Sequence, residues 1–200
     1  LKLGLRMEYT LLNTVLETTG EKNKQEYKNL FPSVHSSYKF SDFISVQAGY
    51  SRRIFRPRLW DLNPFFNIRN NFNIRRGNPE LEPEFADSYE LTAVFVTQKA
   101  SFNTSLYHLF TTNVVERISQ VENNVNITEP SNIGTNSKIG FELNGKYTPL
   151  DYYTLNGDFN YGVFNRKGSF NNQVFDFRGD QWSTRLNNKF KISKELDLEL

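Results

Sequence analysis

The stretch between residues 52 and 90 holds the densest set of side chains that could do chemistry. It contains seven arginines and six carboxylates. A guanidinium and a carboxylate can form two parallel, charge-assisted hydrogen bonds, so this set could lock a loop or bind an anionic ligand. We favour the interpretation in which the set locks a rigid loop. The alternatives are that some of these arginines contact a ligand directly, or that the charges are only solvated. The members are Arg52, Arg53, Arg56, Arg58, Arg69, Arg75 and Arg76, and Asp61, Glu80, Glu82, Glu84, Asp87 and Glu90.

The backbone of the same stretch is stiffened by prolines at positions 57, 64, 79 and 83. Gly77-Asn78 supplies a turn in which positive φ is permitted. The alternating carboxylates Glu80, Glu82 and Glu84 could bind a calcium ion, because hard cations take carboxylate oxygens. The prolines between them favour a solvated ladder instead.

Catalysis finds little support among the remaining residues. His35 and His108 are far apart in the sequence and the chain has no cysteine, which excludes a disulfide scaffold, a thiolate nucleophile and a cysteine-bound metal. No glycine-rich phosphate loop, nucleophile elbow or paired-histidine metal motif occurs. We therefore expect no catalytic residue, no cofactor, no metal ion and no enzyme activity.

Two-faced strands must position these side chains. In Leu1–Tyr9, the odd positions are apolar while Lys2, Arg6 and Glu8 point the other way. A period of two predicts a strand with different solvents on its two faces. Many such strands, with no helix to cover the apolar side, predict an antiparallel, up-and-down transmembrane β-barrel, with lipid outside and water inside.

The composition agrees with this prediction. The mean hydropathy of −0.60 is polar, as in a barrel whose every second residue meets lipid, and no apolar run is long enough for a spanning helix. Aromatic residues reach 15%, which suits girdles at two membrane interfaces. The net charge of +2 is too balanced for a nucleic-acid binder.

We expect about nine strands, joined by connections that alternate between long and short. Long connections cover 17–26, 55–84, an Asn-rich loop around 123–132, and a Gly/Asn loop with Gly168, Asn171 and Asn172. Short turns lie at 40–42, 97–99, 148–152 and 193–195. Outer-membrane barrels have this asymmetry, with the long loops outside the cell. The expected strands are 1–16, 27–39, 43–54, 85–96, 100–119, 133–147, 153–164 and 181–192, with a ninth beginning at Leu196.

Parity within the strands assigns faces to individual side chains. We expect the lumen side to carry Arg6, Glu8, Arg53, Glu142, Lys146, Asp158 and Arg185. We expect the lipid-facing girdles to include Tyr147, Tyr153, Tyr161, Trp182 and Phe190. Eight residues separate Tyr153 from Tyr161 and Trp182 from Phe190, a climb of roughly 20 Å in a tilted strand. Two segments fit less well: 100–110 alternates poorly, and Pro32 cannot donate to a ladder, so pairing should loosen near it.

The order of motifs in the charged stretch resembles a known family. It reads Ser51-Arg52-Arg53-Ile54-Phe55-Arg56-Pro57, then Leu62-Asn63-Pro64-Phe65, then Gly77-Asn78-Pro79-Glu80-Leu81-Glu82-Pro83-Glu84, then Tyr89-Glu90-Leu91. With Tyr27–Ser33 upstream, this string resembles the C-terminal barrel region of TonB-dependent receptors, in the outer-membrane β-barrel family related to carbohydrate and siderophore importers. The resemblance covers nearly the whole chain. Its motif residues, structural or ligand-facing, are Arg52, Arg53, Arg56, Pro57, Asn63, Pro64, Gly77, Asn78, Pro79, Glu84 and Glu90.

The resemblance implies a 22-stranded barrel, an N-terminal plug with a TonB-contacting box, and import of a bulky ligand driven by the proton-motive force. We accordingly expect residues 1–200 to be a single segment of an outer-membrane β-barrel domain, with the plug and the other strands outside it. Arg6 and Arg53 would then meet an anionic substrate or, in preference, a plug carboxylate. The implied partners are outer-membrane lipid, TonB through the plug, and a possible surface lipoprotein or envelope partner.

Three functions remain in view. We favour a TonB-dependent receptor, integral to the bacterial outer membrane, that imports a siderophore, a glycan or a similar ligand. The first alternative is a non-transporting outer-membrane barrel that serves as a structural or assembly subunit of an envelope complex. The second is a soluble β-sandwich, which would bury Leu3, Leu155 and Phe159 in a protein core.

Overall fold

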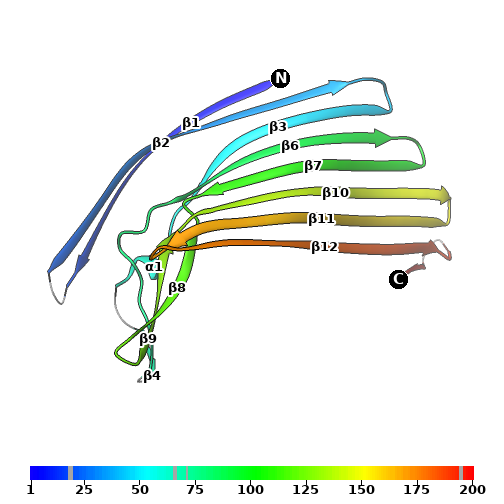
Figure 1. Ribbon diagram of the computed structural model, residues 1–200. Coiled ribbons are helices and arrows are strands. Elements are labelled where there is room, and N and C mark those ends of the chain that lie inside the picture. The colour runs from blue at the N-terminus through cyan, green and yellow to red at the C-terminus, as the bar shows by residue number, and fades with distance from the viewer. Residues whose placement is uncertain (18–19, 65–66, 71, 194–195) are drawn as a thin grey trace.

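Nearly the whole chain forms β-strands in the computed structural model, which describes residues 1–17, 20–64, 67–70, 72–193 and 196–200. Nine strands form one antiparallel sheet, in which each strand pairs with the preceding and the following strand of the series (Figure 1). We call this curved sheet the wall. Its strands are β1 (Lys2–Leu16), β2 (Glu21–Lys39), β3 (Ile44–Phe55), β6 (Glu84–Val96), β7 (Ala100–Thr112), β10 (Thr135–Leu150), β11 (Tyr153–Phe170), β12 (Gln173–Lys191) and β13 (Asp197–Glu199).

A second, smaller sheet is built from two connections of the wall. Segment 56–83 carries α1 (Leu59–Leu62), β4 (Asn67–Asn70) and β5 (Asn73–Arg75), and segment 113–134 carries β8 (Val115–Glu122) and β9 (Val125–Asn132). The strand order is β4-β5-β9-β8, and the parallel pair β5–β9 joins the two segments (Figure 1). We call segments 56–83 and 113–134 together the mouth.

The prediction of an all-β, up-and-down sheet of about nine strands is confirmed. The turns at 40–43, 97–99 and 151–152 lie at one end of the wall, which we call the turn end. The mouth and the connections at 17–20 and 171–172 lie at the opposite end, the loop end. The predicted turn at 193–195 falls partly outside the described residues, as does Phe65 of the motif string. Among the described residues, no helix is long and apolar enough to cross a membrane.

Three predicted boundaries at the loop end are wrong. Segments 17–26 and 165–180 are largely strand, because β2 begins at Glu21 and β11 and β12 meet at a two-residue turn. That turn is Asn171-Asn172, and Asn123-Asn124 makes the matching turn between β8 and β9, all with positive φ. Asparagine tolerates this conformation, so paired asparagines make tight hairpin turns where we expected loops.

The predicted strand 100–119 is also interrupted. Its chain leaves the wall after Thr112, and Asn113 adopts a positive φ of 55°. Val115 then starts β8 in the second sheet. The periodicity of two continues through the break, so the sequence pattern alone could not reveal that the partner sheet changes.

The register of the wall separates apolar from polar side chains. Leu143 lies opposite Phe159 and Thr104, whereas Glu142 lies opposite Asn160 and Ser105. Directly opposite residues share a face, so one face of the wall is apolar and the other is polar. On the apolar face Leu3 is 73% exposed, and a second protein layer would have buried it. The soluble β-sandwich is therefore ruled out for these residues.

The packed core lies at the loop end. The buried apolar side chains of the described residues belong to the mouth or to strand positions that face it. They are Phe31, Leu62, Leu81, Ala86 and Ile133. The mouth thus has a core of its own, while the wall presents its apolar side chains outward.

Candidate functional site

The polar face of the wall carries the four predicted lumen residues of β10, β11 and β12. Glu142, Lys146, Asp158 and Arg185 all fall on the face opposite to Leu143 and Phe159. The Asn160 amide donates to Glu142 Oε1 at 2.6 Å. A shallow hollow of about 300 Å³ lies over this part of the wall and is lined by Lys146, Asp158 and Arg185. The hollow is polar and carries both signs of charge.

Arg6 and Glu8 lie on the same polar face but are not available as separate charges. Arg6 Nε lies 3.0 Å from Glu8 Oε1, and its guanidinium stacks 4.9 Å from the Phe31 ring. Arg56, at the start of the mouth, also donates to Glu8. This hydrogen bond raises the pKa of Arg56 above its ordinary value, and Tyr27 contributes in the same direction. The three charged side chains therefore tie β1 to the mouth.

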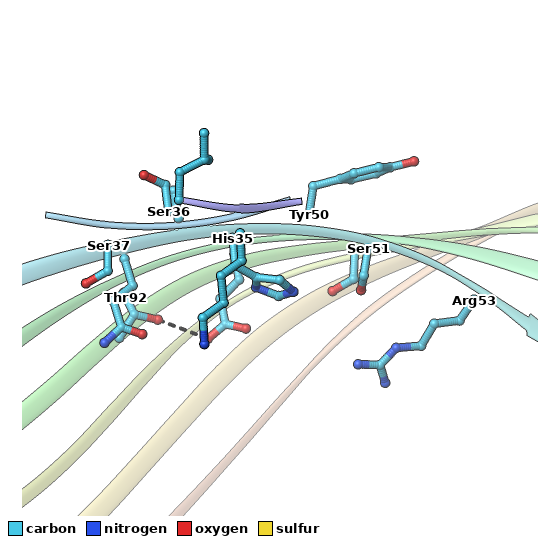
Figure 2. Close-up of a pocket in the computed structure, with 14 residues that line it drawn as sticks. His35, Ser36, Ser37, Tyr50, Ser51, Arg53 and Thr92 are labelled. Atoms are coloured by element: carbon cyan, nitrogen blue, oxygen red, sulfur yellow. Dashed lines mark hydrogen bonds between the residues drawn. The ribbon is translucent and has the colours of Figure 1, made fainter. Parts of the chain in front are cut away.

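Arg53 lies over a polar pocket of about 350 Å³ in the wall, drawn in Figure 2. His35, Ser51 and Arg53 point to one side of the ribbons, whereas Ser36 and Tyr50 point to the other (Figure 2). Glu90 lines the same pocket and accepts a hydrogen bond of 2.9 Å from Thr92 Oγ1. Within the part of the chain that the structure describes, Arg53 has no hydrogen bond and no ion pair, so its charge can meet a bound group.

The turn around Gly77 is held by backbone contacts within the mouth. The Gly77 N–H donates to the Asn63 carbonyl at 2.8 Å, and the Asn78 N–H donates to the Asp61 carbonyl at 2.7 Å. Neither Gly77 nor Asn78 adopts the positive φ that the sequence allowed for. A glycine is needed instead because a Cβ at Gly77 would lie 2.4 Å from that Asn63 oxygen. The Asn78 side chain accepts from the Glu80 N–H at 2.9 Å and donates to the Pro130 carbonyl at 3.2 Å. The motif thus links segment 56–83 to segment 113–134.

Asn132 makes the second link between the two segments. Its amide donates to the carbonyls of Glu82 and Asn113, both at 2.9 Å, and its Oδ1 accepts from the Glu82 N–H at 2.8 Å. The Glu84 carboxylate accepts from the Val115 N–H at 2.8 Å. The Glu82 carboxylate accepts from Asn113 Nδ2 at 3.2 Å, so the carboxylates of Glu82 and Glu84 both bind segment 113–134. Across the described ranges, no group of three or more potential metal ligands occurs.

The third link joins the mouth to β2. The Asn23 and Gln25 amides each donate to the Pro79 carbonyl at 2.7 Å, and Gln25 also donates to the Leu81 carbonyl at 3.0 Å. Pairing between β2 and β3 ends at Ser33, immediately before Pro32 as one moves toward the loop end. This outcome matches the expected loosening near the proline. On the loop-end side of Pro32, β2 no longer pairs with β3, and side chains of β2 bind the mouth instead.

The charges of the arginine-rich stretch mostly pair with other elements. Arg52 and Asp87 form the one ion pair within the set that the structure describes, at 3.0 Å. Arg76 binds Glu129 of β9, and Asp61 binds Arg117 of β8 at 3.1 Å. These partners are about 50 residues apart, so sequence spacing could not identify them. The side chain of Arg69 is outside the described part of the structure.

Two cavities open between the mouth and its neighbours. One, of about 590 Å³, is lined by Arg56, Pro57, Arg58 and Arg117, with Glu84 and Glu116 among its carboxylates. The Arg58 guanidinium is exposed and has no ion pair or hydrogen bond in the described residues. The other, of about 570 Å³, lies between the β1–β2 hairpin and α1 and has a mixed lining, which includes Val15, Leu59 and Leu62 together with Lys22 and Glu80.

The apolar face carries aromatic side chains at both of its borders. Tyr147, Tyr153 and Phe190 lie near the turn end, where the rings of Tyr153 and Phe190 stack with centroids 4.8 Å apart. Tyr161 and Trp182 are directly opposite each other toward the loop end. The spacing of eight residues is thus repeated on neighbouring strands.

Sequence reasoning missed three members of the loop-end border, Tyr50, Tyr89 and His108. Their rings follow one another with centroids 5.0 and 6.0 Å apart. His108 Nε2 lies 2.9 Å from Ser137 Oγ, so this polar ring has a hydrogen-bond partner on the apolar face. The poor alternation of 100–110 arises because Thr104 and His108 lie on the apolar face, while Tyr107 and Leu109 lie on the polar face. The parity of β6 would have found Tyr89.

Comparisons with known proteins identify relatives of this architecture. The family model described as the outer membrane protein beta-barrel family matches residues 1–200. No curated protein matches the sequence at a significant level. The solved structures that resemble the chain include the siderophore receptor PirA from Pseudomonas aeruginosa, with 15% identity and a TM-score of 0.62 over 98% of this chain and 41% of that one.

Two further solved structures share the fold. The copper transporter OprC is 12% identical, with a TM-score of 0.63 over 98% of this chain and 38% of that one. The FrpB iron transporter from Neisseria meningitidis is 14% identical, with a TM-score of 0.57 over 94% of this chain and 35% of that one. The chain spans about two fifths of the length of these proteins.

Proposed function

From the membership of this chain in the outer membrane protein beta-barrel family, we propose that it forms part of the wall and mouth of an importing receptor. Members of this family, and therefore this chain, are integral to the outer membrane. The cargo would be a bulky ligand such as a siderophore or a glycan. Residues 1–200 would be one segment of the barrel domain. The plug and the remaining strands would complete the receptor.

One observation carries the proposal: the polar face of the wall continues into the mouth. The loops of the mouth are held to one another by hydrogen bonds, and cavities open beside them. Hydrogen bonds from Gly77, Asn78 and Asn132 fix the loops to one another. A fixed mouth loses little conformational entropy when a ligand binds, which favours affinity. A charged, hydrated lumen then offers a path that a bulky polar ligand can follow.

Two arginines are placed to contact a bound group. The guanidinium groups of Arg53 and Arg58 have no hydrogen bond and no ion pair among the described residues. Arg53 lines the wall pocket, and Arg58 lines the larger mouth cavity. We assign Arg58 to an anionic part of the ligand. We assign Arg53 to a carboxylate of the plug, because it lies deeper in the wall and its pocket is lined by serines and Thr92. Neither role involves a reaction, and we assign no catalytic step.

The related structures guide the choice of ligands to test. They are named as a siderophore receptor, a copper transporter and an iron transporter, and they support the transporter fold at 12–15% identity. We propose that transport needs TonB, which would pull on the plug. An oligosaccharide belongs in the same panel, because the mouth cavities are large and carry mixed polar and apolar linings.

The test is uptake by cells that express the full-length protein. Labelled ferric siderophores, copper and oligosaccharides are supplied to otherwise identical cells with and without the protein, and with TonB deleted. We expect one class to enter only when both the protein and TonB are present, while surface binding persists without TonB. Uptake that is unchanged without TonB would refute energised import. Absence of uptake for every class, with the protein recovered in a stable envelope complex, would indicate an assembly role instead.

Substitutions separate ligand contact from plug contact. Arg58→Gln should weaken surface binding, whereas Arg53→Gln should leave binding intact and reduce uptake. Lys39→Gln, at the turn end, removes a charge of the same sign far from the mouth and serves as the control. Equal effects of all three variants would contradict both assignments.

A further inference from the structure

Charged side chains on the apolar face of the wall are confined to the loop end. The register places ten of them on that face, and none lies within the apolar band or at the turn end of the described strands. The polar face, by contrast, carries charges along its whole length. The ten are Lys22, Lys24, Glu26, Lys28, Arg52, Asp87, Lys167, Asp176, Arg178 and Asp180.

The strongest concentration of positive charge is on the outward side of β2. Lys22, Lys24 and Lys28 lie opposite Val15, Asn13 and Tyr9, with Glu26 as the one acidic residue between them. We call these three side chains the lysine stripe. The other outward cations are already compensated: Arg52 is bound to Asp87, and Lys167 and Arg178 share Asp176. The stripe keeps an excess of positive charge that the described residues do not neutralise.

Lys24 and Lys28 point away from the mouth, whereas Lys22, nearer the end of the hairpin, also borders the cavity between the hairpin and α1. Asn23, Gln25 and Tyr27 alternate with them and turn toward the mouth, where the two amides bind the Pro79 carbonyl. The even-numbered residues are exposed, as expected for the opposite side of the ribbon. Only weak internal contacts engage them: Lys24 Nζ is 3.5 Å from Glu26, and Lys28 Nζ is 5.4 Å from the Tyr9 ring.

The stripe is placed at the depth of lipid headgroups. Tyr9 is paired with Lys28, and Leu30 lies two residues further toward the turn end. Beyond Leu30, this face of the described strands carries no charged side chain. Tyrosines mark the border between hydrocarbon and headgroups, so ammonium groups just beyond Tyr9 reach the headgroup layer. Leu11 and Leu30 are 48% and 55% exposed beside the stripe, so apolar side chains also face outward here.

We propose that the lysine stripe binds phosphate groups on the headgroup of a lipid in the leaflet at the loop end. Ammonium groups bind phosphate as strong point charges, and several in a row favour a headgroup with more than one phosphate. The exposed Leu11 and Leu30 would contact the acyl chains of the same lipid. This combination distinguishes a lipid from free phosphate, which has nothing to place against the apolar side chains.

The full-length protein in detergent micelles provides the test, with EDTA present to exclude bridging metal ions. The probes are a lipid with a doubly phosphorylated headgroup, the same lipid after dephosphorylation, and inorganic phosphate. Native mass spectrometry counts bound lipid. Each basic residue near an anionic membrane surface contributes about fivefold in affinity, so Lys22→Gln, Lys24→Gln and Lys28→Gln combined should weaken binding of the phosphorylated lipid by about 100-fold at low salt.

The matched control removes three positive charges from the polar face. Lys138→Gln, Lys146→Gln and Arg185→Gln combined should bind the phosphorylated lipid like the unaltered protein. Equal binding of the phosphorylated and dephosphorylated lipids would overturn the proposal, as would unchanged binding by the stripe variant. Displacement of the lipid by millimolar inorganic phosphate would show a plain anion site and would also overturn it. If the triple variant fails to fold, Lys28→Gln alone should still weaken binding about fivefold.

Discussion

The wall and the mouth place the same kinds of side chain in opposite surroundings. Leu5 in the wall is 71% exposed on a face with no protein cover in the described residues, whereas Leu81 in the mouth is 0% exposed. The wall relies on lipid to cover its apolar face, and the mouth buries its own. The two regions should therefore respond differently to the same substitution, and this difference can be measured.

The largest expected effect is in the core of the mouth. Leu81→Ala removes buried methyl groups and leaves a cavity, which should cost about 2–5 kcal/mol. Leu5→Ala loses the transfer free energy of its methyl groups but leaves no cavity, because lipid fills the space, so it should cost less. Hydrogen exchange of amides 77–84 in the full-length protein, together with urea unfolding in vesicles, measures both variants.

The exchange data should localise the damage. Leu81→Ala should accelerate exchange in the mouth and leave the strands of the wall protected. An equal loss of stability in both variants, or exchange that accelerates equally throughout the wall, would show that the mouth and the wall share one packed unit.

The next effect tests the wall. Leu143→Arg places a cation on the apolar face between the two aromatic borders, at a cost of about 2–4 kcal/mol near the bilayer midplane. Asn144→Arg makes the same change one residue along, on the polar face, and should be nearly neutral because the lumen is hydrated. Urea titration in vesicles compares the two. Similar costs for both positions would refute the assignment of faces.

The wall was largely predictable from the sequence, because its strands follow a local rule. Alternation in Leu1–Tyr9 or Leu155–Tyr161 specifies which side chains share a face without any knowledge of distant residues. Even the aromatic borders follow from positions within a strand, as with Trp182 and Phe190. The predicted strand boundaries were wrong mainly at the loop end. There, paired asparagines make tight turns, and strand pairing continues beyond the apolar band.

The mouth was predictable only as a stiff, charged stretch. Its contacts join positions far apart in the sequence, as Asn78 does with Pro130 and Gln25 does with Leu81. The types of these residues are compatible with many partners, and no periodicity selects one. The arginines were also partly misleading. Because they are close in sequence to acidic residues, we expected ion pairs within the stretch, but most of the ion pairs join the stretch to β1, β8 and β9.

A smaller effect concerns two glycines, one in each region. Gly77→Ala would bring a Cβ against fixed backbone atoms of Asn63 and Asp61, and overpacking of this kind costs about 1–3 kcal/mol. Gly4→Ala meets only the Ser33 hydroxyl, which can rotate away, so it should be nearly neutral. Limited proteolysis of the full-length protein in micelles should find new cleavage in the mouth of the first variant alone. Cleavage in both variants, or in neither, would contradict this account.

The smallest effect is that of an ion pair at each end of the molecule. Arg76 and Glu129 bridge the two segments of the mouth and are 37% and 30% exposed, whereas Lys39 and Asp42 at the turn end are 66% and 87% exposed. A double-mutant cycle with Arg76→Gln and Glu129→Gln should give a coupling of about 0.5–1 kcal/mol after solvent screening, with partial loss at high salt. The same cycle at Lys39 and Asp42 should give no measurable coupling, because water surrounds and screens that exposed contact. If the exposed pair couples as strongly as the mouth pair, then loop-to-loop ion pairs do not distinguish the mouth from the wall, and its rigidity must come from Asn78, Asn132 and Gln25 alone.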